Sequence, residues 1–150
     1  MEVDVKMIKR AGLQDAAVVA KMAARLWDTH VDEELKALFC GLIASREAAV
    51  FLAYEAQRAA GFAQCQLRHD YVEGTHTSPV GYLEGIYVEE AFRRHGVALQ
   101  LLKACENWAR GLGCAEFASD CELENKESFG FHLAAGFSEK NRIICFSKEL

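Results

Sequence analysis

The sequence has little of what marks membrane, secreted or nucleic-acid-binding proteins. It contains one proline, Pro79, in 150 residues, and no apolar run reaches the ~18 residues of a membrane span. The segment from Met1 to Arg10 alternates charged and apolar residues instead of placing an apolar stretch after a basic one. A net charge of −5 argues against the clustered basic surface that nucleic acids require. We therefore expect a cytoplasmic protein with no membrane or nucleic-acid partner.

The six cysteines also lack any spacing that indicates a disulfide framework or a metal site. They include no C-x-x-C pair and no histidine partner at metal-ligand spacing. Cys121 adjoins Asp120, and a neighbouring carboxylate disfavours the thiolate that a cysteine nucleophile needs. The expectation is reduced, structural thiols and no bound metal.

The pattern that is present predicts one domain over residues 1–150. A hydrophobic content of 51% at this length suits a domain that buries about two-thirds of its unfolded surface. The acidic balance is compatible with a cationic substrate or simply with solubility. Hydrophobic periodicity predicts the order βααβββαβαβ, an α+β or α/β sheet protein. Strands are expected at 3–7, 50–54, 61–67, 81–88, 114–121 and 143–148, helices at 13–27, 31–45, 96–112 and 125–135, and a surface loop at 68–80.

The turn before the helix at 96–112 has the strongest chemical signal. Arg93, Arg94 and His95 bring positive charge next to Gly96 and the free amides that begin the helix. This combination is suited to holding a pyrophosphate. An isolated R-x-x-G-x-A motif is weak, because many helices begin with Arg and Gly for ordinary reasons. Its place after an apolar strand and before a long amphipathic helix strengthens the interpretation.

At this turn the chain resembles the GNAT superfamily of N-acetyltransferases, whose motif Arg/Gln-x-x-Gly-x-Gly/Ala matches Arg93, Gly96 and Ala98. The resemblance covers almost the whole chain. It implies a mixed, mostly antiparallel sheet with central splayed parallel strands flanked by helices, and acetyl-coenzyme A as cosubstrate. In this family the strand before the turn is bulged, so that its amides face the thioester. The coenzyme-binding residues so implied are Ile86, Tyr87, Val88, Arg93, Arg94, His95, Gly96, Val97, Ala98, Leu99 and Asn125.

Five further segments resemble the aminoglycoside 6'-N-acetyltransferases, a group of smaller bacterial enzymes within this superfamily. The segments are 26–30, 68–72, 78–80, 83–86 and 118–120. The resemblance implies acetyl transfer to the 6'-amine of aminoglycoside antibiotics by direct attack, which confers resistance. The antibiotic site so implied is lined by Trp27, His30, Tyr71, Glu84 and Asp120.

Glu84 and Asp120 are the candidates for the general base. Glu84 interrupts the apolar run from Tyr82 to Val88, where an unpaired carboxylate is costly. Its alternative role is a structural ion pair with Arg68. Asp120 ends an apolar strand, where an aspartate commonly caps the following turn. Either carboxylate would accept a proton, directly or through water, or would only bind an ammonium group.

The chain departs from its relatives at two positions, and other functions stay open. Many superfamily members protonate the leaving thiolate with a tyrosine, where this chain has His132, which can also donate a proton. An acidic residue of some aminoglycoside enzymes is replaced by Asn141, which bears on antibiotic choice. Alternative functions are acetylation of a polyamine or a protein N-terminus, and non-catalytic sensing of acetyl-coenzyme A. A homodimer is possible through the apolar last strand.

Overall fold

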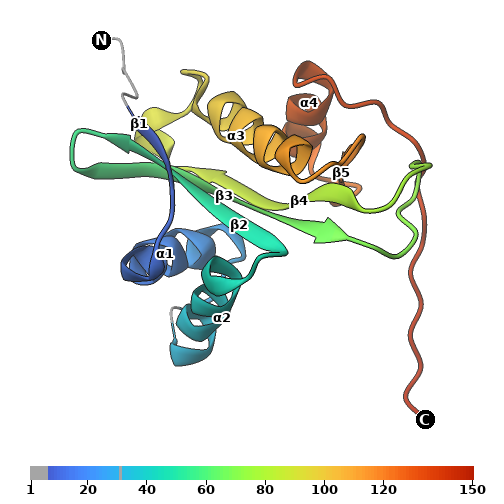
Figure 1. Cartoon of the computed structure of the whole chain (residues 1–150), viewed down its shortest axis with the longest axis horizontal. Helices are drawn as coiled ribbons and strands as arrows, with labels where there is room; N and C mark the ends of the chain where they lie inside the picture. Colours follow the sequence, from blue (N-terminus) through green and yellow to red (C-terminus); the bar gives the residue numbers. More distant parts are fainter. Residues whose placement is uncertain (1–6, 31) are drawn as a thin grey trace.

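A five-stranded sheet with its strands in chain order forms the centre of the computed structural model, which describes residues 7–30 and 32–150. The first four strands are antiparallel, and the fifth runs parallel to the fourth (Figure 1). The strands are β1 (Met7–Arg10), β2 (Ala48–Glu55), β3 (Arg58–Arg68), β4 (Val80–Val88) and β5 (Phe117–Ser119). The helices are α1 (Ala16–Leu26), α2 (Glu33–Ala44), α3 (Val97–Gly111) and α4 (Lys126–Ala134), with short 3₁₀ turns at Leu13–Asp15 and Glu90–Phe92.

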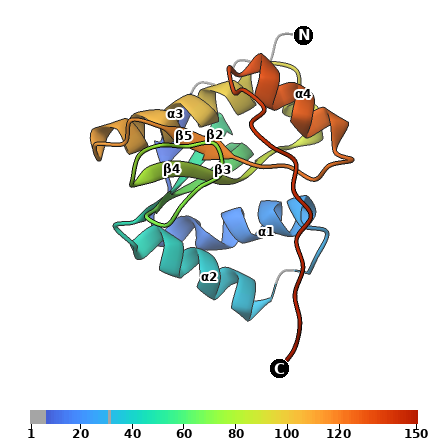
Figure 2. The ribbon, with the colours of Figure 1, turned by 90° about the vertical axis from the view of Figure 1, so that its right-hand side faces the viewer.

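The helices cover the two faces of the sheet. Helices α1 and α2 lie on one face, and α3 and α4 lie on the other (Figures 1 and 2). Val50 and Leu52 of β2 share one buried cluster with α1, whereas Ala49 of the same strand belongs to the cluster of Leu101 and Cys105 from α3. Alternation along the strand therefore supplies both cores, as expected for a sheet covered on both faces.

Local signals in the sequence place the helix starts. Asp32 caps α2 by accepting a hydrogen bond from the Leu35 amide at 2.7 Å. Gly96 precedes α3 with φ +80°, in the left-handed region that glycine adopts without steric cost. Leu101, Cys105 and other residues at helical spacing then bury one face of α3. The predicted mixed α+β fold is confirmed.

Strand β4 is bulged and then separates from β5. Gln64 of β3 pairs with Gly85 and its neighbour Cys65 pairs with Leu83, so Glu84 is an extra residue on β4. The parallel pairing with β5 ends at Leu83, opposite Ser119. From Glu84 to Val88 the second edge of β4 has no strand partner among the described residues. The bulge and the splayed strands that the sequence predicted are both present.

Three predicted strands differ from the structure. Val3 and Val5 lie outside the described residues, and β1 begins at Met7. Strand β5 has three residues where eight were predicted at 114–121. The strand predicted at 143–148 was wrong, because this segment pairs with no strand in its own domain and extends away from it (Figure 1). A short apolar run forms a strand only where a partner edge lies within reach.

All six cysteines are free. Within residues 7–30 and 32–150, the helices are too short or too polar to cross a bilayer.

Candidate functional site

The bulge places Glu84 in an ion pair with the end of the neighbouring strand. Arg68, the last residue of β3, donates from Nε to Oε1 at 2.9 Å and from Nη2 to Oε2 at 3.0 Å. Such a two-bond contact fixes the plane of the carboxylate. The ion pair considered for Glu84 from the sequence is therefore present, and the carboxylate is oriented by it.

Tyr82 connects this pair to the second carboxylate. Its ring lies under the guanidinium of Arg68, with 3.5 Å between Cζ and the ring centroid, and its hydroxyl donates to Oδ2 of Asp120. Burial, followed by the hydrogen bond to Asp120, raises the pKa of the Tyr82 hydroxyl well above its ordinary value. Tyr82 therefore keeps its proton at neutral pH. The residues Glu84, Arg68, Tyr82 and Asp120 form one continuous network, called here the carboxylate network.

Trp27 approaches this network from the end of α1. It stacks on Phe39 of α2, with 5.9 Å between ring centroids and 12° between planes, and it remains 42% exposed. A Cβ on Gly85 would come within 3.4 Å of the Trp27 ring and 3.3 Å of Leu26. The glycine after Glu84 thus lets the end of α1 lie close against β4.

The two other predicted acceptor residues occupy more open positions. His30 follows α1 and is exposed. Tyr71 is 77% exposed and lies in the connection between β3 and β4, three residues after Arg68. The structure thus brings Trp27, Glu84 and Asp120 to the separation of β4 and β5, with Tyr71 and His30 farther out on loops.

The predicted coenzyme turn lies directly before α3. Nothing lies within 4 Å of a Cβ placed on Gly96, and Arg94 and His95 are exposed beside it. The first amides of a helix have no partner within the helix and attract anions. Arg93 instead donates from Nε to the Val88 carbonyl at 2.7 Å, which ties the turn to the end of β4. The residues present fit a pyrophosphate group.

Helix α4 contributes a second polar group near the strand separation. Asn125 caps α4 by accepting from the Ser128 amide at 3.0 Å. His132 Nδ1 lies 2.7 Å from the Ser128 carbonyl, which only accepts, so Nδ1 holds a proton. Nε2 of the same ring lies 2.8 Å from the hydroxyl of Ser119, the last residue of β5. In the neutral ring Nε2 accepts from Ser119.

Sequence reasoning missed two members of this arrangement. Tyr82 had no distinguishing motif, although its spacing of two residues from Glu84 on a strand places both on one face. Ser119 was quoted only as part of a family segment, and its partner His132 lies 13 residues away. Neither pairing has a local sequence signal.

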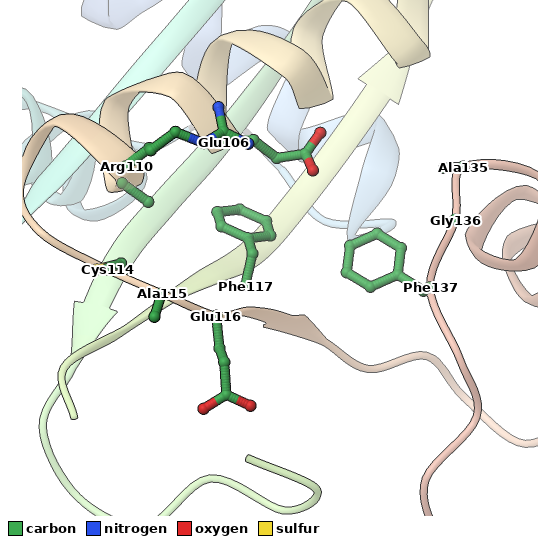
Figure 3. A pocket seen from close by; sticks show the side chains of 10 residues that line it. Glu106, Arg110, Cys114, Ala115, Glu116, Phe117, Ala135, Gly136 and Phe137 are labelled. Atoms are coloured by element: carbon green, nitrogen blue, oxygen red, sulfur yellow. The ribbon is translucent and has the colours of Figure 1, made fainter. Parts of the chain in front are cut away.

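A hollow of about 240 Å³ lies elsewhere, between the last turns of α3, the segment that leads into β5 and the residues after α4 (Figure 3). The side chains of Phe117 and Phe137 line it, together with Glu106 and Arg110 of α3 (Figure 3). The predicted site residues are not part of this hollow.

Comparison with known proteins agrees with this geometry. The model of the acetyltransferase (GNAT) family matches residues 17–137. An aminoglycoside N(6')-acetyltransferase type 1 of Stenotrophomonas maltophilia is 43% identical, with 95% of this chain and 93% of that protein covered. A protein of the same name from Acinetobacter haemolyticus is 38% identical, with 98% and 99% covered.

Solved structures give the same result. AAC(6')-Iy in complex with the bisubstrate analogue CoA-S-monomethyl-acetylneamine superposes with a TM-score of 0.92 at 37% identity, with 96% of this chain and 98% of that chain covered. The aminoglycoside 6'-N-acetyltransferase AAC(6')-IG of Acinetobacter haemolyticus gives a TM-score of 0.89 at 38% identity, with 96% and 99% covered. With its bulged β4, its open turn before α3 and this match over most of its length, the chain belongs to the acetyltransferase (GNAT) family.

Proposed function

We propose that this protein transfers the acetyl group of acetyl-coenzyme A to the 6'-amine of aminoglycoside antibiotics and so confers resistance. The main support is the carboxylate network, with the Trp27 ring beside Gly85, on a chain about 40% identical to enzymes of that name. Aminoglycosides are polycations, and carboxylates beside aromatic faces suit ammonium groups on sugar rings. Its six free thiols suit the reducing cytoplasm as its location.

Acetyl-coenzyme A is proposed to bind along the open edge of β4 and the start of α3. The amides of Val97, Ala98 and Leu99 would hold the pyrophosphate, with Arg94 and His95 adding positive charge. An amide of β4, that of Ile86 or Val88, would donate to the thioester carbonyl and stabilise the oxyanion as attack proceeds.

We assign proton acceptance to Asp120 rather than to Glu84. Both oxygens of Glu84 accept hydrogen bonds from Arg68, whereas the Tyr82 hydroxyl engages only Oδ2 of Asp120. The second oxygen, Oδ1, can therefore take a proton from the substrate ammonium, directly or through one water. Glu84 then binds a neighbouring cationic group of the antibiotic and orients it.

The reaction needs a proton at the opposite end of the transferred group. Attack forms the N–C bond and breaks the C–S bond, which leaves a thiolate. The Ser119 hydroxyl is proposed to give its proton to sulfur, and a protonated His132 to restore it from Nε2 across their 2.8 Å contact. The fixed Nδ1 bond to Ser128 keeps Nε2 aimed at Ser119.

A homodimer is proposed through the C-terminal segment 138–150, called here the arm. Its apolar side chains are exposed, with Ile144 at 81% and Phe146 at 90%. An extended segment with free amides and apolar side chains pairs readily with a free strand edge. The outer edge of β5 is such an edge, and the hollow beside Phe117 would receive apolar side chains of a second copy.

The dimer is tested by light scattering coupled to size exclusion. Phe146→Asp should shift the protein to the mass of one chain, because a charge would enter the apolar contact. Ser147→Asp adds the same charge to the adjacent residue, which points to the other face of an extended segment, and should leave the dimer intact. Equal masses for both variants and the unmodified protein would contradict arm exchange.

The reaction is tested by incubating the protein with acetyl-coenzyme A and kanamycin and identifying products by mass spectrometry. An analogue with a hydroxyl in place of the 6'-amine is the control. Singly acetylated kanamycin with no product from the analogue supports both the reaction and its position. Acetylation of spermidine or peptides alone would indicate another amine acceptor. Coenzyme binding without turnover on any amine would indicate a sensor.

A further inference from the structure

The connection between β3 and β4, residues 69–79, is called here the acceptor loop. It begins directly after Arg68, the partner of Glu84, and it holds the exposed Tyr71. Only part of this loop is anchored on the body of the domain. Val72 is buried with Val80 and Tyr82, while the part around His76 to Ser78 is exposed. The position of this outer part therefore depends on specific polar contacts.

Glu116, the residue before β5, supplies three of those contacts, and the Ser78 hydroxyl supplies another by donating to the His69 carbonyl at 2.8 Å. Oε1 of Glu116 accepts hydrogen bonds from the amides of His76 and Thr77, both at 2.8 Å, and from the Thr77 hydroxyl. The hydrogen bond from that hydroxyl, followed by those from the amides, lowers the pKa of Glu116, so the charged carboxylate is the form that holds the loop. The carboxylate points away from Phe117 and Phe137 of the hollow (Figure 3).

The backbone of Glu116 holds the end of the same loop. Its carbonyl accepts from the amide of Gly81 at 3.1 Å, next to the start of β4. One residue thus fixes both the outer part of the loop and the strand into which it leads. Asp120 lies four residues farther along the same segment. The acceptor loop and the proposed base are therefore positioned by one short stretch of chain.

A second contact holds the loop from the base of the arm. Asn141 Nδ2 donates to Glu73 Oε1 at 2.8 Å. The stem of Lys140 covers Gly74, where an added Cβ would lie 2.4 Å from Lys140 Cγ. Asn141 was expected from the sequence to bear on antibiotic choice. Its contact with Glu73 gives it a route to do so through the loop.

We infer that Glu116 is a positioning residue for the amine acceptor: it locks the acceptor loop in the geometry that binds substrate and leaves the coenzyme site unaffected. The inference rests on the proposed function, because it requires the loop to line the acceptor site. Without these hydrogen bonds the loop adopts other positions as well. The apparent affinity for the amine acceptor is then multiplied by the fraction of molecules whose loop is in the binding-competent position. We expect the change to affect acceptor binding, because the contacts of the carboxylate network and of the proposed coenzyme site do not involve the Glu116 side chain.

Steady-state kinetics of Glu116→Ala, Glu116→Gln and Thr77→Val test this assignment. Glu116→Ala should raise the KM for kanamycin about three- to tenfold if the competent fraction falls to about 0.1–0.3, with kcat and the KM for acetyl-coenzyme A unchanged. Glu116→Gln keeps an oxygen acceptor without the charge and should recover only part of the loss. The Glu116→Ala/Thr77→Val pair should be non-additive, because both changes remove the hydrogen bond from the Thr77 hydroxyl to Glu116. Glu34→Ala, an exposed carboxylate on α2, is the control and should match the unmodified protein.

Hydrogen exchange of residues 69–79 provides a readout that needs no substrate. Faster exchange in Glu116→Ala together with a raised acceptor KM supports the inference. Unchanged exchange, or faster exchange with an unchanged acceptor KM, overturns it. If another amine is the true acceptor, the proposed function fails, and the KM for that amine decides the role of Glu116 by the same comparison.

Discussion

Replacing Asp120 by asparagine and Glu84 by glutamine should separate the two carboxylates by their kinetic effects. Asp120→Asn removes the proposed proton acceptor but still accepts a hydrogen bond from Tyr82. Loss of a general base costs about 10²- to 10⁴-fold in rate, so kcat should fall within that range. Because the carboxylate also contacts a cationic substrate, the KM for the aminoglycoside should rise less than kcat falls.

Glu84→Gln should act mainly on binding and stability. It breaks an ion pair whose side chains are 39% exposed for Arg68 and 21% exposed for Glu84. A partly exposed pair contributes about 1 kcal/mol or less to the free energy of unfolding, so the variant should remain folded at assay temperature. The acceptor KM should rise while kcat changes by less than about tenfold.

The assay follows acetylated kanamycin by mass spectrometry at saturating acetyl-coenzyme A, with thermal unfolding of each variant as a check on folding. Initial rates at several kanamycin concentrations separate kcat from KM. A larger loss of kcat in Glu84→Gln than in Asp120→Asn would refute the assignment of the base. A loss below tenfold in a fully folded Asp120→Asn would show that proton removal is not limiting.

Three other predictions concern single contacts. Tyr82→Phe removes the hydroxyl that orients Asp120. It should lower the free energy of unfolding, measured by urea denaturation, by about 1 kcal/mol and should also lower kcat. An unchanged kcat would show that Asp120 needs no such orientation. Gly61→Ala would place a Cβ 2.5 Å from the Tyr87 carbonyl oxygen. It should therefore lower the free energy of unfolding by about 1–3 kcal/mol, measured by the same denaturation, and raise the KM for acetyl-coenzyme A, measured by kinetics. Because the pKa of Glu116 is lowered in the folded protein, its stabilisation of the acceptor loop is complete above the ordinary glutamate pKa. That stabilisation is lost only as pH falls through the lowered pKa. Loop exchange, corrected for intrinsic rates, should therefore stay protected at neutral pH and through mild acid, and loss of protection near pH 6 would contradict this.

The sequence by itself determined the elements with strong local signals. Helices α2 and α3 begin at Glu33 and Val97, close to the predicted starts at 31 and 96, because the side-chain cap at Asp32 and the left-handed residue Gly96 are local properties. As far as α4, the order of strands and helices followed from hydrophobic periodicity in the same way. Glu84 was selected as a site candidate because a carboxylate within an apolar strand needs a partner, and Asp120 was selected through the family resemblance.

Only the tertiary structure decided what those carboxylates touch. The network joins β3, β4 and the residue after β5, and the bulge at Glu84 exists only in the register between two strands. Such contacts depend on pairing between distant segments, which no local window reports.

The same reason explains the failed prediction at the C-terminus. Residues 143–148 begin with the short apolar run of a strand, Ile143 to Phe146, yet they pair with no strand in their own domain. A pattern records which face of a segment can be buried, and only the arrangement of the remaining chain determines whether a strand edge is there to receive it.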